Sequence, residues 1–131
     1  MPWSPESTCC TDVLFCYVLI SRVENNEAKG TLTITALSGE RERQKIVYQN
    51  VLYSQIGKES EGKRIAIAEE LTPEELRSNR HRAAAQRFID DCSLKNLNTL
   101  EKMMERGYHF YTHYIGEKYE NIVVAKSLCI S

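Results

Sequence analysis

The sequence lacks a hydrophobic run long enough to cross a membrane as a helix. The longest apolar stretch runs from Val13 to Ile20, eight residues, whereas a membrane-spanning helix needs about 20. The segment before it carries Glu6 and Asp12 but no Lys or Arg, and no small-residue cleavage site follows. A secretory signal is therefore disfavoured as well, and the run predicts a buried strand.

Cysteines are few and irregularly spaced. There are five of them and no C-x-x-C pair, which argues against a disulfide framework and against the common zinc-binding spacings. Cys16, Cys92 and Cys129 lie within apolar patterns, where a free cysteine behaves as a small buried side chain. Cys9 and Cys10 lie in a polar N-terminal arm, either unmodified or as acceptors for palmitate. We expect a cytoplasmic protein, with peripheral contact to membranes left open.

The usual catalytic signatures are also missing. No G-x-x-x-x-G-K-[ST], G-x-G-x-x-G or G-x-S-x-G motif occurs. His109 and His113 have a spacing that joins one metal ion on a helix, but on a strand they would lie about 13 Å apart. The adjacent Glu69 and Glu70 would point to opposite faces of a strand, which does not suit shared acid–base work. A thiol enzyme using Cys92 is disfavoured because burial makes a thiol inert. We expect no enzyme, no cofactor and no metal site.

The net charge argues against one further class of function, nucleic-acid binding. Seventeen basic and eighteen acidic side chains leave a net charge of −1, so a strongly basic nucleic-acid binder is disfavoured. The first predicted helix nevertheless has a basic side, consisting of Arg77, Arg80, Arg82 and Arg87. This side could contact phosphoinositide headgroups, nucleic acid or an acidic partner, or it could be a solvated face balanced by neighbouring acidic residues.

What the sequence does contain is a set of strand and helix signals. Apolar, β-branched and alternating segments predict strands at 13–23, 31–37, 46–56, 64–69, 108–115 and 119–130. Thr72-Pro73-Glu74-Glu75 has the residues of a capping box with proline at the first helical position, and it predicts a helix from Pro73 to Asp91. A second capping box at 98–101 predicts another helix that ends at Gly107.

This order predicts an α+β fold with a largely antiparallel sheet of five or six strands and one or two helices packed on one face. The length of 131 residues suits one domain. We expect residues 1–11 to form a flexible N-terminal arm and residues 12–131 a single α+β domain. Within it, residues 12–48 would form an N-terminal strand pair, followed by the remaining part at 49–131.

Three stretches carry a resemblance to a known family. Val51–Ile56 resembles the opening strand of the longin domain, the N-terminal fold of certain vesicle SNARE proteins, and Arg64–Glu69 resembles its second strand. The aromatic segment that starts at Gly107 and the Val-Val-Ala segment that ends at Ser127 resemble its central hairpin. Residues 51–127 are thus longin-like. No SNARE heptad stretch or membrane anchor is found, so we expect no fusion activity from this chain itself.

The resemblance implies a regulatory or sorting module that binds another polypeptide in a groove beside the first helix. The candidate partner-binding residues are Ala85, Phe88, Phe110, Thr112 and Tyr114. Our first hypothesis is a non-catalytic protein-interaction module in vesicle trafficking, with a protein or peptide as partner. The alternative is an adaptor that binds nucleic acid or anionic lipid through the basic helix 73–91, nucleic acid being the less favoured ligand. Dimerisation through a sheet edge is left open.

Overall fold

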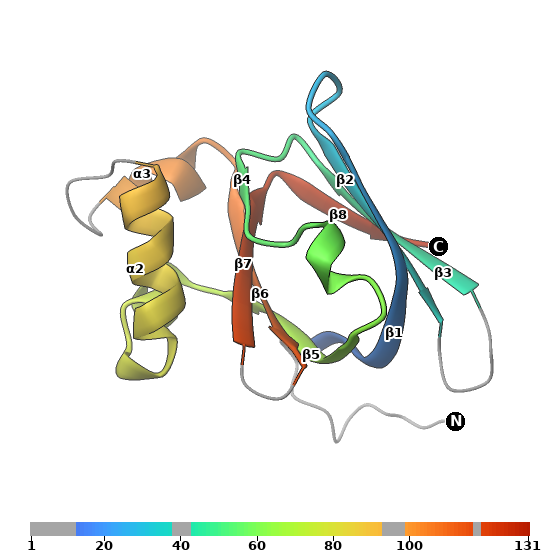
Figure 1. Ribbon diagram of the computed structural model, residues 1–131. Helices are drawn as coiled ribbons and strands as arrows, with labels where there is room; N and C mark the ends of the chain where they lie inside the picture. The colour runs from blue at the N-terminus through green and yellow to red at the C-terminus, as the bar shows by residue number, and fades with distance from the viewer. Residues whose placement is uncertain (1–12, 38–42, 93–98, 117–118) are drawn as a thin grey trace, which may run out of the picture.

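The computed structural model describes residues 13–37, 43–92, 99–116 and 119–131 (Figure 1). The expected N-terminal arm, with Cys9 and Cys10, lies outside these residues. So does the second capping box, apart from Thr99, Leu100 and Glu101.

Eight strands form one antiparallel sheet in the order β4-β7-β6-β5-β1-β2-β3-β8. They are β1 (Val13–Asn26), β2 (Thr31–Leu37), β3 (Arg43–Gln49), β4 (Tyr53–Ser54), β5 (Arg64–Leu71), β6 (His109–Ile115), β7 (Tyr119–Ala125) and β8 (Ser127–Ile130). The predicted fold class, with five or six strands and helices on one face, is therefore wrong. The additional strands arise because two segments that were each predicted as one strand are broken in two.

The two breaks allow the sheet to close on itself. The first follows Gln49, where Asn50 adopts a left-handed conformation with φ of 55°, and the second lies at Lys126. The Lys126 amide donates to the Gln49 carbonyl (3.0 Å) and the Leu52 amide to the Val124 carbonyl (2.8 Å). As a result, β3 pairs with β8 and β4 pairs with β7. The bent strands complete a barrel, which Figure 1 shows from one side.

The barrel interior is the main hydrophobic core. Side chains along β2 alternate between buried and partly exposed, because successive residues of a strand point to opposite faces of the sheet. Leu32, Ile34 and Ala36 thus face inward and contribute to the core. The largest other side chains of this core are Ile20, Ile46, Tyr48, Ile56, Ile65, Tyr111 and Ile115.

The helix predicted at 73–91 forms three pieces: α1 (Pro73–Leu76), the 3₁₀ turn η2 (Asn79–His81) and α2 (Arg82–Asp91). The predicted capping box is confirmed, since the Thr72 hydroxyl accepts from the Glu75 amide (3.1 Å) and the Glu75 carboxylate from the Thr72 amide (2.9 Å). The break follows at Ser78, which is extended and donates its hydroxyl to the Glu75 carbonyl (2.6 Å). Such local bonds compete with the helical pattern.

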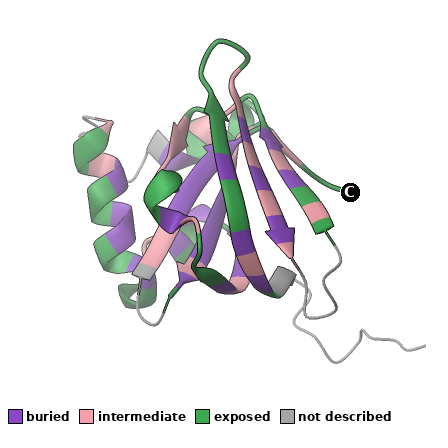
Figure 2. Ribbon diagram, turned by 45° about the vertical axis from the view of Figure 1, so that its right-hand side comes forward, coloured by how far each residue is buried: buried purple, intermediate pink, exposed green. Residues whose placement is uncertain are grey.

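A layer of helices covers the outer face of β6 and β7. It consists of α1, η2, α2 and α3 (Thr99–Glu105), whereas a second 3₁₀ turn, η1 (Lys58–Ser60), packs against β1. Figures 1 and 2 show α2 beside the sheet, with its buried residues turned toward the strands. This interface contains a second hydrophobic core, made of Leu71, Leu76, Ala84, Ala85, Phe88, Leu100, Phe110, Ile122 and Val124.

The strands of residues 12–48 and those of residues 49–131 belong to the same sheet. β1 lies in its interior, paired with β2 on one side and with β5 on the other. Among the residues that the structure describes, no helix is long and apolar enough to cross a membrane.

Candidate functional site

The five predicted partner-binding residues lie on α2 and β6, at the interface between the helix layer and the sheet. Ala85, Phe88, Phe110 and Thr112 are buried, and Tyr114 is half-buried. The rings of Phe88 and Phe110 lie 6.3 Å apart. Ala85, Phe88 and Phe110 therefore belong to one hydrophobic core rather than to an open groove, whereas Thr112 bonds Glu120 and the Tyr114 hydroxyl lies 3.4 Å from His81 Nδ1. A binding role for them remains a prediction, and in this structure they offer little exposed surface to a partner.

A polar cluster occupies the other half of the same interface. The Glu120 carboxylate on β7 accepts short hydrogen bonds from the His81 imidazole on η2 and from the Thr112 hydroxyl on β6. His81 is only 3% exposed. Because both donors share one carboxylate, the cluster fixes η2 to the sheet. A buried imidazole and carboxylate without bonded partners would destabilise the fold.

Glu69 on β5 adds a second carboxylate to this region. Its Oε1 atom is buried and accepts no hydrogen bond. The nearest cation is the Arg80 guanidinium, 3.9 Å away, which is too far for a hydrogen bond but close enough for electrostatic attraction. Arg80 also lies over the Tyr114 ring, 5.8 Å from its centre. Arg80 is thus engaged by the protein's own acidic and aromatic side chains.

Gln55, which was not predicted as a site residue, links α2 to the barrel. Its side-chain amide donates to the Ala84 carbonyl (3.2 Å), and its side-chain oxygen accepts from the Ile122 amide (2.8 Å) and from Arg87 (2.7 Å). Arg87 also donates to the Glu120 carbonyl (3.1 Å). One residue after β4 therefore holds both the helix and the neighbouring strand.

The four arginines of the predicted basic patch differ in their surroundings. Arg77 forms a two-pronged pair with Glu101 on α3, which raises the pKa of Arg77 and lowers the pKa of Glu101. Arg80 and Arg87 have the partners described above. Arg82 is exposed, and its side chain makes no hydrogen bond or ion pair with another described residue. The patch is therefore not one uniform basic surface.

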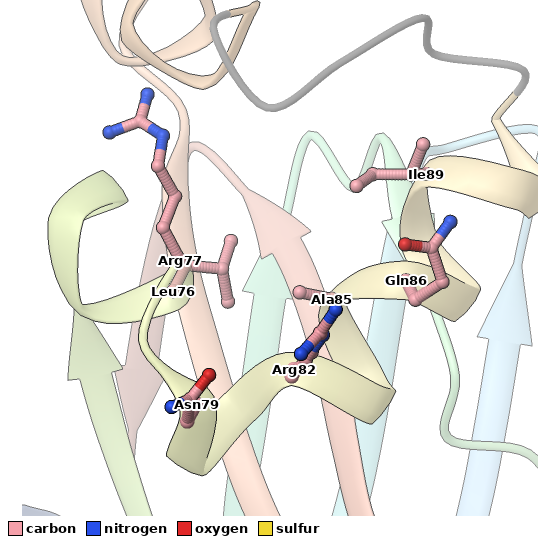
Figure 3. A pocket seen from close by; sticks show the side chains of 7 residues that line it. All are labelled: Leu76, Arg77, Asn79, Arg82, Ala85, Gln86 and Ile89. Carbon is pink, nitrogen blue, oxygen red and sulfur yellow. The ribbon is translucent and has the colours of Figure 1, made fainter.

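Arg82 stands at the rim of a hollow of about 320 Å³ between α1, η2 and α2. Figure 3 shows the side chains of Leu76 and Arg77 on one side of this hollow and those of Gln86 and Ile89 on the other. Leu76 and Ala85 are buried at its floor and Ile89 is half-buried, whereas the rim is polar. The rim consists of Arg77, Asn79, Arg82 and Gln86. An apolar floor with a cationic, hydrogen-bonding rim suits a short peptide segment.

The barrel interior holds a separate polar pair. His109, Tyr111 and His113 share the inward face of β6, as the alternation predicts. The buried His113 Nδ1 donates to the Asn121 carbonyl (3.0 Å), and its Nε2 accepts from the Tyr48 hydroxyl. Burial lowers the pKa of His113 to about 4. His113 is thus a neutral, fully bonded part of the core.

No metal centre is formed by the part of the chain that the structure describes, where no three His, Cys, Asp or Glu side chains are placed to share an ion. His109 instead bonds Glu70 through its Nδ1 atom (2.7 Å). At the end of α2, burial and the charge of Asp91 raise the pKa of the Cys92 thiol. A raised pKa reduces the thiolate fraction on which nucleophilic reactivity depends.

Comparison of the chain with protein-family models, curated proteins and solved structures found no match. The longin resemblance of residues 51–127 therefore remains a prediction from the sequence.

Proposed function

We propose that this chain is a non-catalytic protein-interaction module, and that the hollow between α1, η2 and α2 holds a short acidic segment of another polypeptide. The observation that carries the proposal is the position of Arg82. Its side chain is exposed at the rim, makes no hydrogen bond or ion pair with another described residue, and stands beside the apolar floor formed by Leu76 and Ala85.

Two kinds of contact would define the partner. A volume of about 320 Å³ lies at the lower end of the range for ligand pockets, so the floor takes one apolar side chain rather than a large ligand. The guanidinium of Arg82 presents several donors in a fixed plane, which match the two oxygens of a carboxylate. The expected partner segment therefore carries an Asp or Glu next to an apolar residue.

The alternative, binding of nucleic acid or anionic lipid by the basic helix, receives less support. Affinity for such ligands depends on several cations that each contact a phosphate. Three of the four arginines already have partners within the protein. Arg77 pairs with Glu101, and Arg80 contacts Glu69 and Tyr114. Arg87 donates hydrogen bonds to Gln55 and to the Glu120 carbonyl. Of the four arginines, this leaves Arg82 to contact a ligand, and one guanidinium suits a single carboxylate.

The cellular role follows from a different argument. A regulatory or sorting function in vesicle trafficking is proposed on the longin resemblance of residues 51–127 alone. The hollow specifies the chemistry of a partner, not its pathway.

The test is a titration of the protein with a peptide that contains Asp-Leu-Glu, followed by NMR. We expect the amide signals of Leu76, Ala85 and Gln86 to shift, and Arg82→Gln to weaken binding about tenfold, as loss of one charge-assisted pair implies. Arg106→Gln, an exposed arginine after α3, is the control and should leave binding unchanged. Shifts confined to other residues, or equal binding by Arg82→Gln, would rule out the hollow.

A further inference from the structure

A second charged surface lies on the side of the barrel away from α2 (Figure 1). It is the outward face of β1, β2 and β3, where β2 presents Thr31, Thr33, Thr35 and Leu37 while Leu32, Ile34 and Ala36 fill the core. At one end of this face is a hollow of about 370 Å³, lined by Ser21, Arg22, Glu24, Thr35, Arg43 and Lys45. None of these side chains is apolar.

Strand register places the cations of this hollow around one hydroxyl. Arg22 on β1 pairs with Thr35 on β2, and Thr35 pairs with Lys45 on β3. Neighbouring strands lie about 5 Å apart, so both cations flank Thr35 directly. Arg43 is the next outward residue of β3, about 7 Å along the strand. Three cationic side chains can therefore reach a single point above Thr35.

These cations are only weakly engaged by the protein. Arg43 and Lys45 are exposed, and neither side chain pairs with another described residue. Arg22 lies 3.5 Å from the Glu24 carboxylate, but both side chains are more than half exposed. An exposed pair of this kind contributes little stability. A stronger anion could therefore replace Glu24 at Arg22.

We propose that this hollow binds one phosphate group, carried by a phosphorylated side chain of another polypeptide. A phosphate monoester brings a charge of about −1.5 to −2 and three acceptor oxygens at pH 7, which matches three convergent cations and the Thr35 hydroxyl. The site lies on a different surface from the hollow at α2, so it does not depend on the proposed function.

Two other carriers of phosphate fit less well. Single-stranded nucleic acid is held by aromatic side chains on which bases stack, together with a groove that follows the backbone. Among the described residues, no aromatic side chain lines the hollow, and Tyr48 of β3 points into the core. A lipid surface is held by apolar insertion added to charge, and none of the described lining residues is apolar. A single phosphorylated residue needs neither feature.

The test compares a phosphothreonine peptide with its unphosphorylated form by calorimetry at pH 7.5. We expect the phosphopeptide to bind at least about tenfold more tightly, and Lys45→Gln or Arg43→Gln to weaken it about fivefold each, because each removes one charge-assisted contact. Glu24→Gln should strengthen binding, since it removes the competing carboxylate. Arg106→Gln, an exposed arginine after α3, is the control and should have no effect.

The pH dependence of phosphopeptide affinity provides a second test, independent of the substitutions. The second pKa of a phosphate monoester is about 6, so affinity should fall between pH 7.5 and pH 5 as the dianion takes up a proton. Equal binding of both peptides, or unchanged affinity in Lys45→Gln, would overturn the proposal. Tighter binding to vesicles that contain a phosphoinositide, or to oligouridine, than to the phosphopeptide would also overturn it.

Discussion

The interior of the barrel and the interface beneath α2 are both buried, but they are held together differently. The barrel core is enclosed by backbone hydrogen bonds between paired strands, and its main polar contact is the bond between His113 and Tyr48. The α2 interface is divided into an apolar half and a polar half, and side chains such as Gln55 and Arg87 make its hydrogen bonds. Side-chain substitutions should therefore destabilise the helix layer more readily than the barrel.

The largest expected effect tests whether the two cores unfold separately. Phe88 is a fully buried residue of α2, and its ring lies 4.9 Å from the Tyr53 ring. Phe88→Ala should reduce the free energy of unfolding by about 3–5 kcal/mol through loss of packing and a remaining cavity. Hydrogen exchange should show that α2 amides lose protection first, while β2 amides keep theirs.

Ile34→Ala is the matched variant for the barrel interior. Ile34 is also fully buried, and its truncation should cost about 2–5 kcal/mol and lower protection throughout the molecule. If Phe88→Ala exposed β2 as much as α2, the two cores would be one cooperative unit and the distinction between them would be lost.

A somewhat smaller effect concerns the polar pair inside the barrel. The pKa of His113 is about 4 in the folded chain because of burial, and an unfolded histidine has a pKa near 6.5. Between these values only the unfolded chain takes up the proton. The contribution of His113 to stability should therefore be constant above about pH 6.5 and fall by roughly 3 kcal/mol as the pH approaches 4.

Urea denaturation at pH 7.0 and pH 4.5 measures this loss. The protein with His113→Asn should lose less stability over the same interval, since the titrating group is gone while the carboxylates remain. An identical pH dependence in both proteins would assign the acid sensitivity to groups outside the barrel.

The smallest effect concerns the link between the helix layer and the barrel. Gln55→Ala should cost about 1–3 kcal/mol, because it leaves the buried amide of Ile122 without its acceptor. Gln55→Glu keeps an acceptor for Ile122 and Arg87 but cannot donate to the Ala84 carbonyl. Thermal unfolding should rank Gln55→Glu between the wild-type chain and Gln55→Ala. A reversed ranking would mean that the bond to Ala84 matters more than the other two.

Local features of the fold were predictable from the sequence, but its closure was not. The alternation of residues 31–37 correctly predicted β2, and Thr72 and Glu75 form the expected capping box. The breaks after Gln49 and at Lys126 were missed because they depend on pairing between β3 and β8, segments about 80 residues apart in the chain. No pattern within either segment indicates such a partner.

The same limit applies to the candidate sites. The arginines of the basic patch could be identified, yet the sequence could not tell that Glu101 engages Arg77 while Arg82 has no partner among the described residues. Gln55 and Glu120 carry no local signal at all. The outward threonines of β2 follow from alternation alone, but the cations around Thr35 depend on a register that only the structure provides.

Closure of the barrel by β8 also determines when folding can finish during protein synthesis. Ile46 of β3 pairs with Ile130 of β8, so one side of β3 has no partner until residues 127–130 have left the ribosome. An unpaired strand edge is a template for association with other chains. The nascent chain should therefore bind chaperones through β3 during this interval, and a pause in translation before residue 127 would lengthen its exposure to aggregation.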